Sequence, residues 1–552
     1  MTSGALITQI FIAVTALFLC GSPAFAQEPG ITFHGATYLS VDGYTSSSQD
    51  SSWKPRMPPL SARGIFKANI SLYDKVDIPF EIYAATSGLG FQQPFNQFGM
   101  SPRFGWLTVH AGYFSTKYSE LSFGDVRMLG GGFEANPGKF RIAGLYGIAR
   151  QARAKDTTVG FLGEYKRTLT ALKLGYGDEN EYFVHLNAIQ AIDNASSLTA
   201  DSTSPLPTEN LAATLNFGLP FSGIISMNGE IGVSAFSNDI HSPELAGENV
   251  PKVPSFLFTP RYSSQIDGAA KLSILITPAS AWNVRLNSQW IGPGYVSLGY
   301  VQLQNDILEA TIAPSVRLFE SKLLLRGSFG MRYNNLRNTR LSSTRRMIGS
   351  FLTSAQILDN LGLDIQYSNY GLRSTHVNDT MRVQNIFQML SVSPRWNFSG
   401  WGANHALSAS FAYQNMDDKN IFTSVSTNSN TSLWSLMHTL SLEPTLSFTS
   451  SVFYTSIFTT YLNTKALNLS ETVSNSYLDT KLTVSLTGGY SFVQTIGQDN
   501  QIIGRLSAAY QLTSASQLIL TVNSNNYDYA QAVSGNPSFR EYQASLQYQL
   551  TF

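Results

Sequence analysis

Apolar and polar residues alternate with a period of two along most of the chain. The alternation is clear in 66–72, 225–234, 308–318 and 323–333. A period of two places successive side chains on opposite faces of a β-strand, whereas a helix repeats every 3.6 residues. Similar patterns predict further strands near 264–276, 361–371, 403–414, 452–463 and 501–512.

Two kinds of connection separate these strands. Tight turns are predicted where short polar stretches fall between apolar ones, at 136–139, 177–180 and 513–516. Longer polar stretches at 45–59, 238–263, 415–431 and 528–537 are expected to form loops. Because turns and loops alternate in antiparallel hairpins, the loops should lie at the end of the sheet opposite the turns.

The length of the alternating region decides between two β architectures. A soluble β-sandwich domain has about 100 residues, but here the alternation continues for about 500 residues without a linker. One closed barrel removes all sheet edges, and spanning strands take about 9–11 residues each. We therefore expect an all-β fold, a single large transmembrane antiparallel β-barrel of roughly 20–26 strands, over residues 27–552. The up-and-down pattern does not close in 89–127 and 464–500, and 89–127 is a candidate for an inward-folded constriction.

Composition supports this class and excludes others. Charged residues make up 13% of the 552 residues, against about 25% in soluble domains. Aromatic residues reach 12%, and 36 basic residues balance 36 acidic ones. A disordered chain would carry more net charge, a nucleic-acid binder would be basic, and a helical membrane protein would have longer apolar runs.

The N-terminus has the features of a cleaved signal peptide at residues 1–26. An apolar stretch over 10–19 is followed by Ala24-Phe25-Ala26 and then Gln27. This order fits export and an A-x-A cleavage site, although no basic residue precedes the apolar stretch. The only cysteine, Cys20, lies in this segment, and Leu19 before it does not fit a lipidation site. The mature chain therefore contains no cysteine and no disulfide.

The last strand has a distinctive pattern. The chain ends EYQASLQYQLTF, so Tyr548, Leu550 and Phe552 fall on one face and glutamines on the other. A terminal amphipathic strand that ends in Phe resembles the closing strand of bacterial outer-membrane barrels. This resemblance implies recognition by the barrel-assembly machinery and a place in the outer-membrane lipid.

Four blocks extend the resemblance. They read FNQFGMSPRF (95–104), NPGKFRIAGLYG (136–147), IGPGYVSLGYVQLQND (291–306) and RYNNL (332–336). They resemble uncharacterised outer-membrane β-barrel proteins of Bacteroidetes- and Chlorobi-type bacteria. Similar proteins usually carry an acidic residue where Gly292 stands. The resemblance implies the fold and the location but brings no established function.

Candidate chemistry is sparse. The seven histidines are spread with no metal-ligand spacing such as H-x-x-x-H. The glycines at 130–132 lack the Lys-Ser/Thr of a phosphate loop, and no G-x-S-x-G elbow is present. Asn415, Asp417 and Asp418 are more typical of a solvated turn than of a calcium loop. We expect no catalytic residue, metal or cofactor.

Two charged groups stand out. The first is basic and spans 139–173, where surface charge that meets anionic lipid is the preferred interpretation. The second consists of Glu309, Arg317, Arg326 and Arg332, on the polar face of adjacent strands. Because a charge facing lipid at mid-bilayer costs about 2–4 kcal/mol, these four should point into the lumen. There they either pair with each other or line a pore and favour anions.

These observations favour a porin-like channel for small solutes. The alternative is a structural or docking barrel that holds an envelope partner, and an outer-membrane enzyme ranks third. A receptor with an N-terminal plug is disfavoured because alternation begins near Ile31. No nucleic-acid partner is expected.

The cleavage site gives a first prediction. N-terminal sequencing of the protein from outer-membrane fractions should begin at Gln27, because signal peptidase cleaves after A-x-A. A mature protein that begins at Met1 would contradict it.

Overall fold

A computed structural model describes most of the chain. It describes residues 30–552 except 51–52, 74, 86–96, 125, 158–159, 180, 200, 202, 222, 248–252, 301, 377, 421, 423, 443–444 and 531–536. The predicted signal peptide and the expected start at Gln27 therefore lie outside the described residues.

Most of the residues that the structure describes lie in β-strands. The first strands are β1 (Ile31–Ser48), β2 (Leu60–Leu72), β3 (Val76–Ala85), β4 (Gln97–Met100), β5 (Arg103–Phe104), β6 (Leu107–Phe114), β7 (Phe123–Gly124), β8 (Met128–Ala135), β9 (Phe140–Arg150), β10 (Lys166–Gly177), β11 (Phe183–Asn194), β12 (Glu209–Phe221), β13 (Ile225–Ser237), β14 (Ser264–Ala279) and β15 (Trp282–Ile291). The later strands are β16 (Gly299–Tyr300), β17 (Ile307–Leu318), β18 (Leu323–Asn334), β19 (Ser342–Leu358), β20 (Leu361–His376), β21 (Gln384–Gly400), β22 (Ala403–Asp418), β23 (Ser429–Leu442), β24 (Leu446–Thr459), β25 (Asn463–Tyr477), β26 (Leu482–Gln494), β27 (Gln498–Thr513), β28 (Ser516–Asp528) and β29 (Phe539–Thr551).

Among the described residues, helices are few and short. They are η1 (Ala195–Ser197), η2 (Asp379–Met381) and α2 (Ser424–Thr427). Within the described part of the chain, no helix has the length and apolar character needed to cross a membrane.

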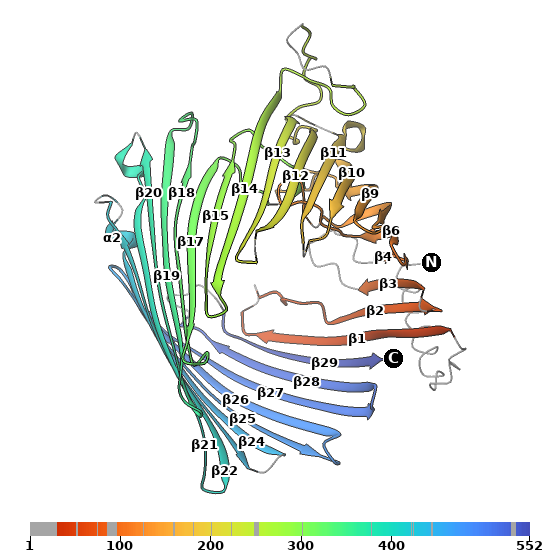
Figure 1. Ribbon diagram of the computed structural model, residues 1–552. Helices are drawn as coiled ribbons and strands as arrows, with labels where there is room; N and C mark the ends of the chain where they lie inside the picture. The colour runs from red at the N-terminus through yellow and green to blue at the C-terminus, as the bar shows by residue number, and fades with distance from the viewer. Residues whose placement is uncertain are drawn as a thin grey trace.

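The strands close into one antiparallel barrel (Figure 1). Among the described residues, 27 strands share one sheet, and β4 and β5 both pair with β3 and β6, so the wall has 26 strand positions. Closure comes from β1 against β29, in register from Ala36↔Thr551 to Ser48↔Phe539. The predicted fold class is therefore confirmed, and 26 lies within the predicted range.

Turns and loops lie at opposite ends of the wall. The turns at 136–139 and 514–515 lie at the end where β1 begins and β29 ends, which we call the terminal end. The predicted loops, such as 238–263, join strands at the other end, which we call the loop end. The region 464–500 resolves into β25, a turn and β26, so the up-and-down order closes. The predicted strand at 452–463 was wrong in its bounds, because β24 ends at Thr459 and β25 begins at Asn463.

The wall has one apolar and one polar face. On β29, Tyr542, Ala544 and Leu546 are exposed on the apolar face. Cross-strand pairing between neighbouring strands places Val41, Leu506 and Met331 on this same face, so the apolar face continues around the barrel. The face with glutamines and serines lies on the other side. In a closed barrel that crosses a membrane the apolar face must be outside, so we call the faces outer and inner.

Two connections fold against the inner face. Residues 115–127 join β6 to β8, and residues 292–306 join β15 to β17. Each contributes one short strand, and β7 and β16 pair in parallel as a separate two-stranded sheet. The predicted constriction at 89–127 is therefore correct only in part. Residues 115–127 fold inward, but β4, β5 and β6 belong to the wall. Residues 86–96 lie outside the described residues.

The C-terminal residue closes the seam between the first and last strands. The Phe552 N–H donates to the Gly35 carbonyl oxygen at 3.0 Å, and the Gly35 N–H donates to the Phe552 carbonyl oxygen at 2.8 Å. The Phe552 ring lies 4.8 Å from the ring of Phe33 and 5.9 Å from that of Phe66. A Cβ at Gly35 would lie 2.8 Å from the Phe552 ring, so the glycine makes room for it.

We predict that Phe552→Glu impairs barrel assembly. It removes two aromatic contacts, each of about 0.5–1.5 kcal/mol, and places a charge on the outer face of the closing strand. Heat-modifiable, protease-resistant barrel should fall well below wild-type levels. The control is Gln549→Glu, a charge on the inner face of the same strand, which should assemble normally; equal yields for both variants would contradict the prediction.

Candidate functional site

The inner face of the barrel is the candidate site, and part of it is covered by a packed core. Side chains of the segment 115–127, including Tyr118, Phe123 and Val126, are buried against the wall. The wall contributes small and aliphatic inner-face residues from β9 to β12: Ala143, Leu145, Leu169, Ala171, Ile189, Ala191 and Ala212. These strands are apolar on both faces here, because the segment rather than water covers their inner side.

A buried carboxylate fixes the turn at the centre of this segment. Glu230 of β13 accepts a hydrogen bond from the Ser119 hydroxyl. It also accepts the backbone N–H of Glu120 at 3.0 Å and that of Leu121 at 3.1 Å. A charged acceptor with three donors offsets the cost of burying the carboxylate. Glu230 therefore acts as the main anchor between the wall and the segment 115–127.

The second inward segment, 292–306, packs on the first. The Tyr295 hydroxyl donates to the Leu121 carbonyl oxygen at 3.1 Å, and the Ser297 hydroxyl donates to the Ser122 carbonyl oxygen at 2.5 Å. The wall holds it through Asn210, whose side-chain oxygen accepts the Leu298 N–H at 3.0 Å. Burial, reinforced by the charge of Glu230, raises the pKa of Tyr295, so this phenol stays a neutral hydrogen-bond donor.

Two aspartates anchor the ends of the segment 292–306. Asp267 accepts the Gly294 N–H at 2.7 Å and pairs with Arg337 at 2.7 Å. Asp306 pairs with Arg340 at 3.0 Å. A Cβ at Gly292 would lie 2.3 Å from the Asp267 carboxylate, so the carboxylate of Asp267 occupies the space that a side chain at 292 would need.

A polar cavity of about 400 Å³ lies beside the anchor. Its lining includes Glu120, Glu230, Lys271 and Glu309. Glu120 pairs with Lys271 and with Lys117, at 3.4 Å each. Burial opposes ionisation of Glu120, but the two lysines outweigh it, so the pKa of this carboxyl lies below its usual value.

A second polar cavity, of about 240 Å³, lies between the start of the segment 115–127 and strands β8 to β11. Its lining is mainly charged or titratable, and includes Lys117, Glu134, Arg141, Lys173 and His185. The inner surface around the folded segments is therefore polar and of mixed charge, which suits contact with water or polar solutes.

The four residues predicted to line a pore all face inward. Glu309 and Arg332 are cross-strand partners and form an ion pair at 3.6 Å. Arg317 and Arg326 have no ion pair with any described carboxylate. Of the two alternatives, structural pairing applies to Arg332. Arg317 and Arg326 remain candidates for a pore lining.

Sequence reasoning missed Arg285. It lies on the inner face of β15, one strand from Arg317, and its cross-strand partner is Ala313. It also has no ion pair with a described carboxylate. The alternation in 282–291 would have identified it. Arg285, Arg317 and Arg326 form an inner basic patch near the terminal end.

Most of the basic region at 139–173 is neutralised. Asp193 accepts Arg150 at 3.1 Å and Arg167 at 2.8 Å. Other pairs in the region are Lys139–Glu181, Arg153–Glu164 and Lys155–Asp201. Most of the positive charge that would attract anionic lipid is therefore already paired, which weakens the lipid-binding interpretation of this region.

Two histidines that are distant in sequence meet on the outer face. His405 Nδ1 lies 3.0 Å from His438 Nε2, and His405 Nε2 lies 3.1 Å from the Gly400 carbonyl oxygen. Cross-strand pairing of β22 with β23 brings them together, which sequence spacing did not indicate. Across the described residues, no group of three or more His, Cys, Asp or Glu side chains could hold a metal ion.

Comparisons with known proteins add little. No family model matches the chain, and no curated protein matches its sequence. Among solved structures, the chain is similar to the FrpB iron transporter from Neisseria meningitidis, with 10% identity, a TM-score of 0.40, and 95% of this chain and 83% of that chain covered. It is also similar to the P pilus usher (PapC) translocation pore, with 10% identity, a TM-score of 0.33, and coverage of 95% and 99%. The third is OccAB4 of Acinetobacter baumannii, with 13% identity, a TM-score of 0.30, and coverage of 67% and 97%. Likeness at this level carries no argument about function.

We predict that Glu230→Ala loosens the segment 115–127. The amides of Glu120 and Leu121 should exchange hydrogen at least about tenfold faster, because one hydrogen bond to a charged acceptor contributes about 1.5–3 kcal/mol. Hydrogen exchange read by mass spectrometry measures this. Glu309→Ala removes an inner-face carboxylate of the same cavity, which forms no hydrogen bond or ion pair with the described residues of the segment, and it should leave exchange there unchanged. Full protection in Glu230→Ala would show that the apolar packing alone holds the segment.

Proposed function

We propose that this protein is an outer-membrane channel for small solutes. The observation that carries the proposal is the polar inner face of a wall with 26 strand positions. Barrels of 16–18 strands already enclose an aqueous channel. A larger wall whose inner face has Gln, Ser and Thr, as on β29, favours a lumen that holds water rather than an apolar core.

Placement in the outer membrane is supported by the apolar outer face. Its exposed residues include Leu172, Leu186, Ile231 and Leu546, as expected for a surface in contact with acyl chains. The short turns at the terminal end then face the periplasm and the loops face the outside, as in other barrels of this membrane. Export and assembly would use the signal peptide and the terminal Phe552.

The inward segments 115–127 and 292–306 would narrow this channel. They cover the inner face of β9 to β15 and are fixed by Glu230, Asp267 and Asp306. A constriction of this kind limits the size of a solute, while charged side chains beside it set a preference for one sign of charge.

A docking barrel is the second candidate. The observation that favours it is the amount of ordered, hydrogen-bonded structure inside the wall, which a simple pore does not need. Conductance in planar bilayers separates the two: discrete conducting steps favour the channel, and a silent, folded barrel favours docking. The absence of an enzymatic activity stays an expectation.

We predict that Arg317→Gln combined with Arg326→Gln shifts selectivity toward cations. Both guanidiniums are fixed positive charges, and neither forms an ion pair with a carboxylate that the structure describes. The reversal potential in a KCl gradient should move in the cation direction, and the difference should shrink as salt rises from 0.1 to 1 M, where the Debye length falls from about 10 to about 3 Å.

Glu309→Gln serves as the opposite control. It leaves Arg332 unpaired, so the reversal potential should move toward anions. If both variants conduct with wild-type selectivity, these residues lie outside the conduction path. If neither they nor the wild type conducts, the channel proposal fails.

A further inference from the structure

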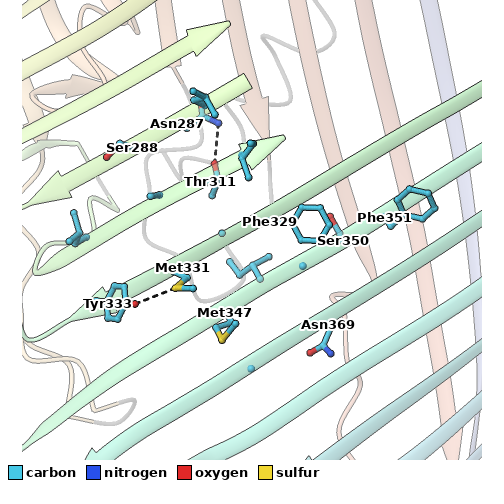
Figure 2. A pocket seen from close by; sticks show the side chains of 18 of the residues that line it. Asn287, Ser288, Thr311, Phe329, Met331, Tyr333, Met347, Ser350, Phe351 and Asn369 are labelled. Carbon is cyan, nitrogen blue, oxygen red and sulfur yellow. Dashed lines mark hydrogen bonds between the residues drawn. The ribbon is translucent and has the colours of Figure 1, made fainter. Parts of the chain in front are cut away.

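The outer face of the barrel carries a large apolar groove across β14 to β21. Its volume is about 1230 Å³, and large side chains such as Phe329, Met331, Met347 and Phe351 line it. Figure 2 shows these four side chains on neighbouring strands, with Tyr333 beside Met331. The alternation of β18 and the register with β19 place all of them on the outer face.

Small residues create the groove. Ala310, Gly349 and Gly371 line it at outer-face positions where neighbouring strands carry large side chains. A Cβ at Gly349 would lie 3.7 Å from Phe329, and one at Gly371 would lie 3.9 Å from Met347. Both are ordinary contacts, so a methyl group at either position would fit without moving the backbone, and the two glycines leave space that a side chain could occupy. An unfilled apolar groove facing a bilayer is a place for acyl chains.

Two arginines face outward at the loop end of this groove. Arg345 of β19 and Arg373 of β20 are direct cross-strand partners. Arg345 reaches over the groove lining, with its guanidinium 3.4 Å from Met331 Sδ and 5.4 Å from the ring of Tyr333. Like charges directly opposite each other destabilise a sheet. A bound anion between them would remove that cost.

No described carboxylate serves as that anion. Neither Arg345 nor Arg373 forms an ion pair within the described residues. Asp417, an outward-facing carboxylate on β22, pairs with Lys419 instead. The pair of arginines therefore has no carboxylate partner among the described residues and lies next to an apolar groove.

The height of the pair fits the headgroup region of the outer leaflet. On β19 the outer-face positions from Met347 to Ile357 are apolar or small, apart from Thr353. The ten steps from Met347 to Ile357 span about 33 Å along the strand and about 24 Å across a bilayer at a tilt of about 45°. The apolar band of an outer-membrane barrel is about 25 Å tall. Arg345 lies one outer-face position beyond it, at the loop end.

The geometry points to a binding site for the lipid A part of lipopolysaccharide. Its acyl chains lie in the groove over Gly349 and Gly371, and its phosphates bind Arg345 and Arg373. Arginine suits phosphate because its planar donors can bind two oxygens at once. The site depends on the outer-membrane placement but does not require the lumen to conduct.

Native mass spectrometry of the purified mature barrel in detergent tests this site. The probes are hexa-acylated lipid A with two phosphates, the same lipid without phosphates, and phosphatidylethanolamine. The wild type should retain one bis-phosphorylated lipid A per barrel and retain the other two lipids far more weakly.

Variants separate the headgroup from the groove. Arg345→Gln combined with Arg373→Gln should weaken retention about thirtyfold, from two lost contacts between basic side chains and an anionic headgroup. Gly349→Leu should weaken it while both arginines remain. The matched control, Arg332→Gln combined with Arg346→Gln, removes two inner-face charges from β18 and β19 and should bind lipid A like the wild type.

Each contrary result overturns the site. Equal retention of lipid A with and without phosphates would remove the role of the arginines. Wild-type binding in Gly349→Leu would place the acyl chains elsewhere. A dimer that excludes the lipid would show that a second copy of the chain fills the groove. Heat-modifiable migration of each variant checks that it is folded, and planar-bilayer conductance reports separately on the channel.

Discussion

The backbone hydrogen bonds between β1 and β29 are the contacts on which the rest of the structure depends. A sheet in lipid has no water to satisfy an exposed edge, so every edge must be paired. The register from Ala36↔Thr551 to Ser48↔Phe539 supplies that pairing, and Phe552 extends it by two more hydrogen bonds to Gly35. Closure at 26 strand positions also fixes the size of the lumen, and the interior features follow from that size.

A lumen this wide needs specific contacts to order anything inside it. The apolar inner patch on β9 to β12 gives the segment 115–127 a surface to cover, and Glu230 fixes its turn. The segment 292–306 then packs on the first and is tied down by Asp267 and Asp306. The polar cavities beside them and the inner basic patch are the parts of the lumen where a solute would meet charge.

The sequence predicts the wall better than the interior. Period-two alternation alone indicates the faces of β18 and β29, because a half-buried strand repeats every two residues whatever its partners. It does not indicate that Glu230 binds residues 119–121, since that contact joins positions more than a hundred residues apart. The pairing of His405 with His438, 33 residues apart, was missed because it depends on the register of β22 with β23. The sequence left open whether the arginines pair, and the register of β17 with β18 shows that Arg332 pairs with Glu309, at 3.6 Å. Contacts set by closure and register become visible only when the strands are assembled.

Single-cysteine labelling tests the two-faced wall most directly. Cys20 is the only cysteine of the chain, so in a Cys20→Ser background each introduced thiol reports alone. A membrane-impermeant maleimide is supplied both outside and inside vesicles that contain the barrel, so that it reaches both ends of the lumen. It should label cysteines that replace the inner-face residues Ser545, Gln547 and Gln549. It should not label cysteines that replace the outer-face residues Ala544, Leu546 and Tyr548. A cysteine at Ala171 should stay unlabelled, although it faces inward, because the segment 115–127 covers it. Uniform labelling along β29, or labelling of the apolar positions alone, would contradict a lumen enclosed by the polar face.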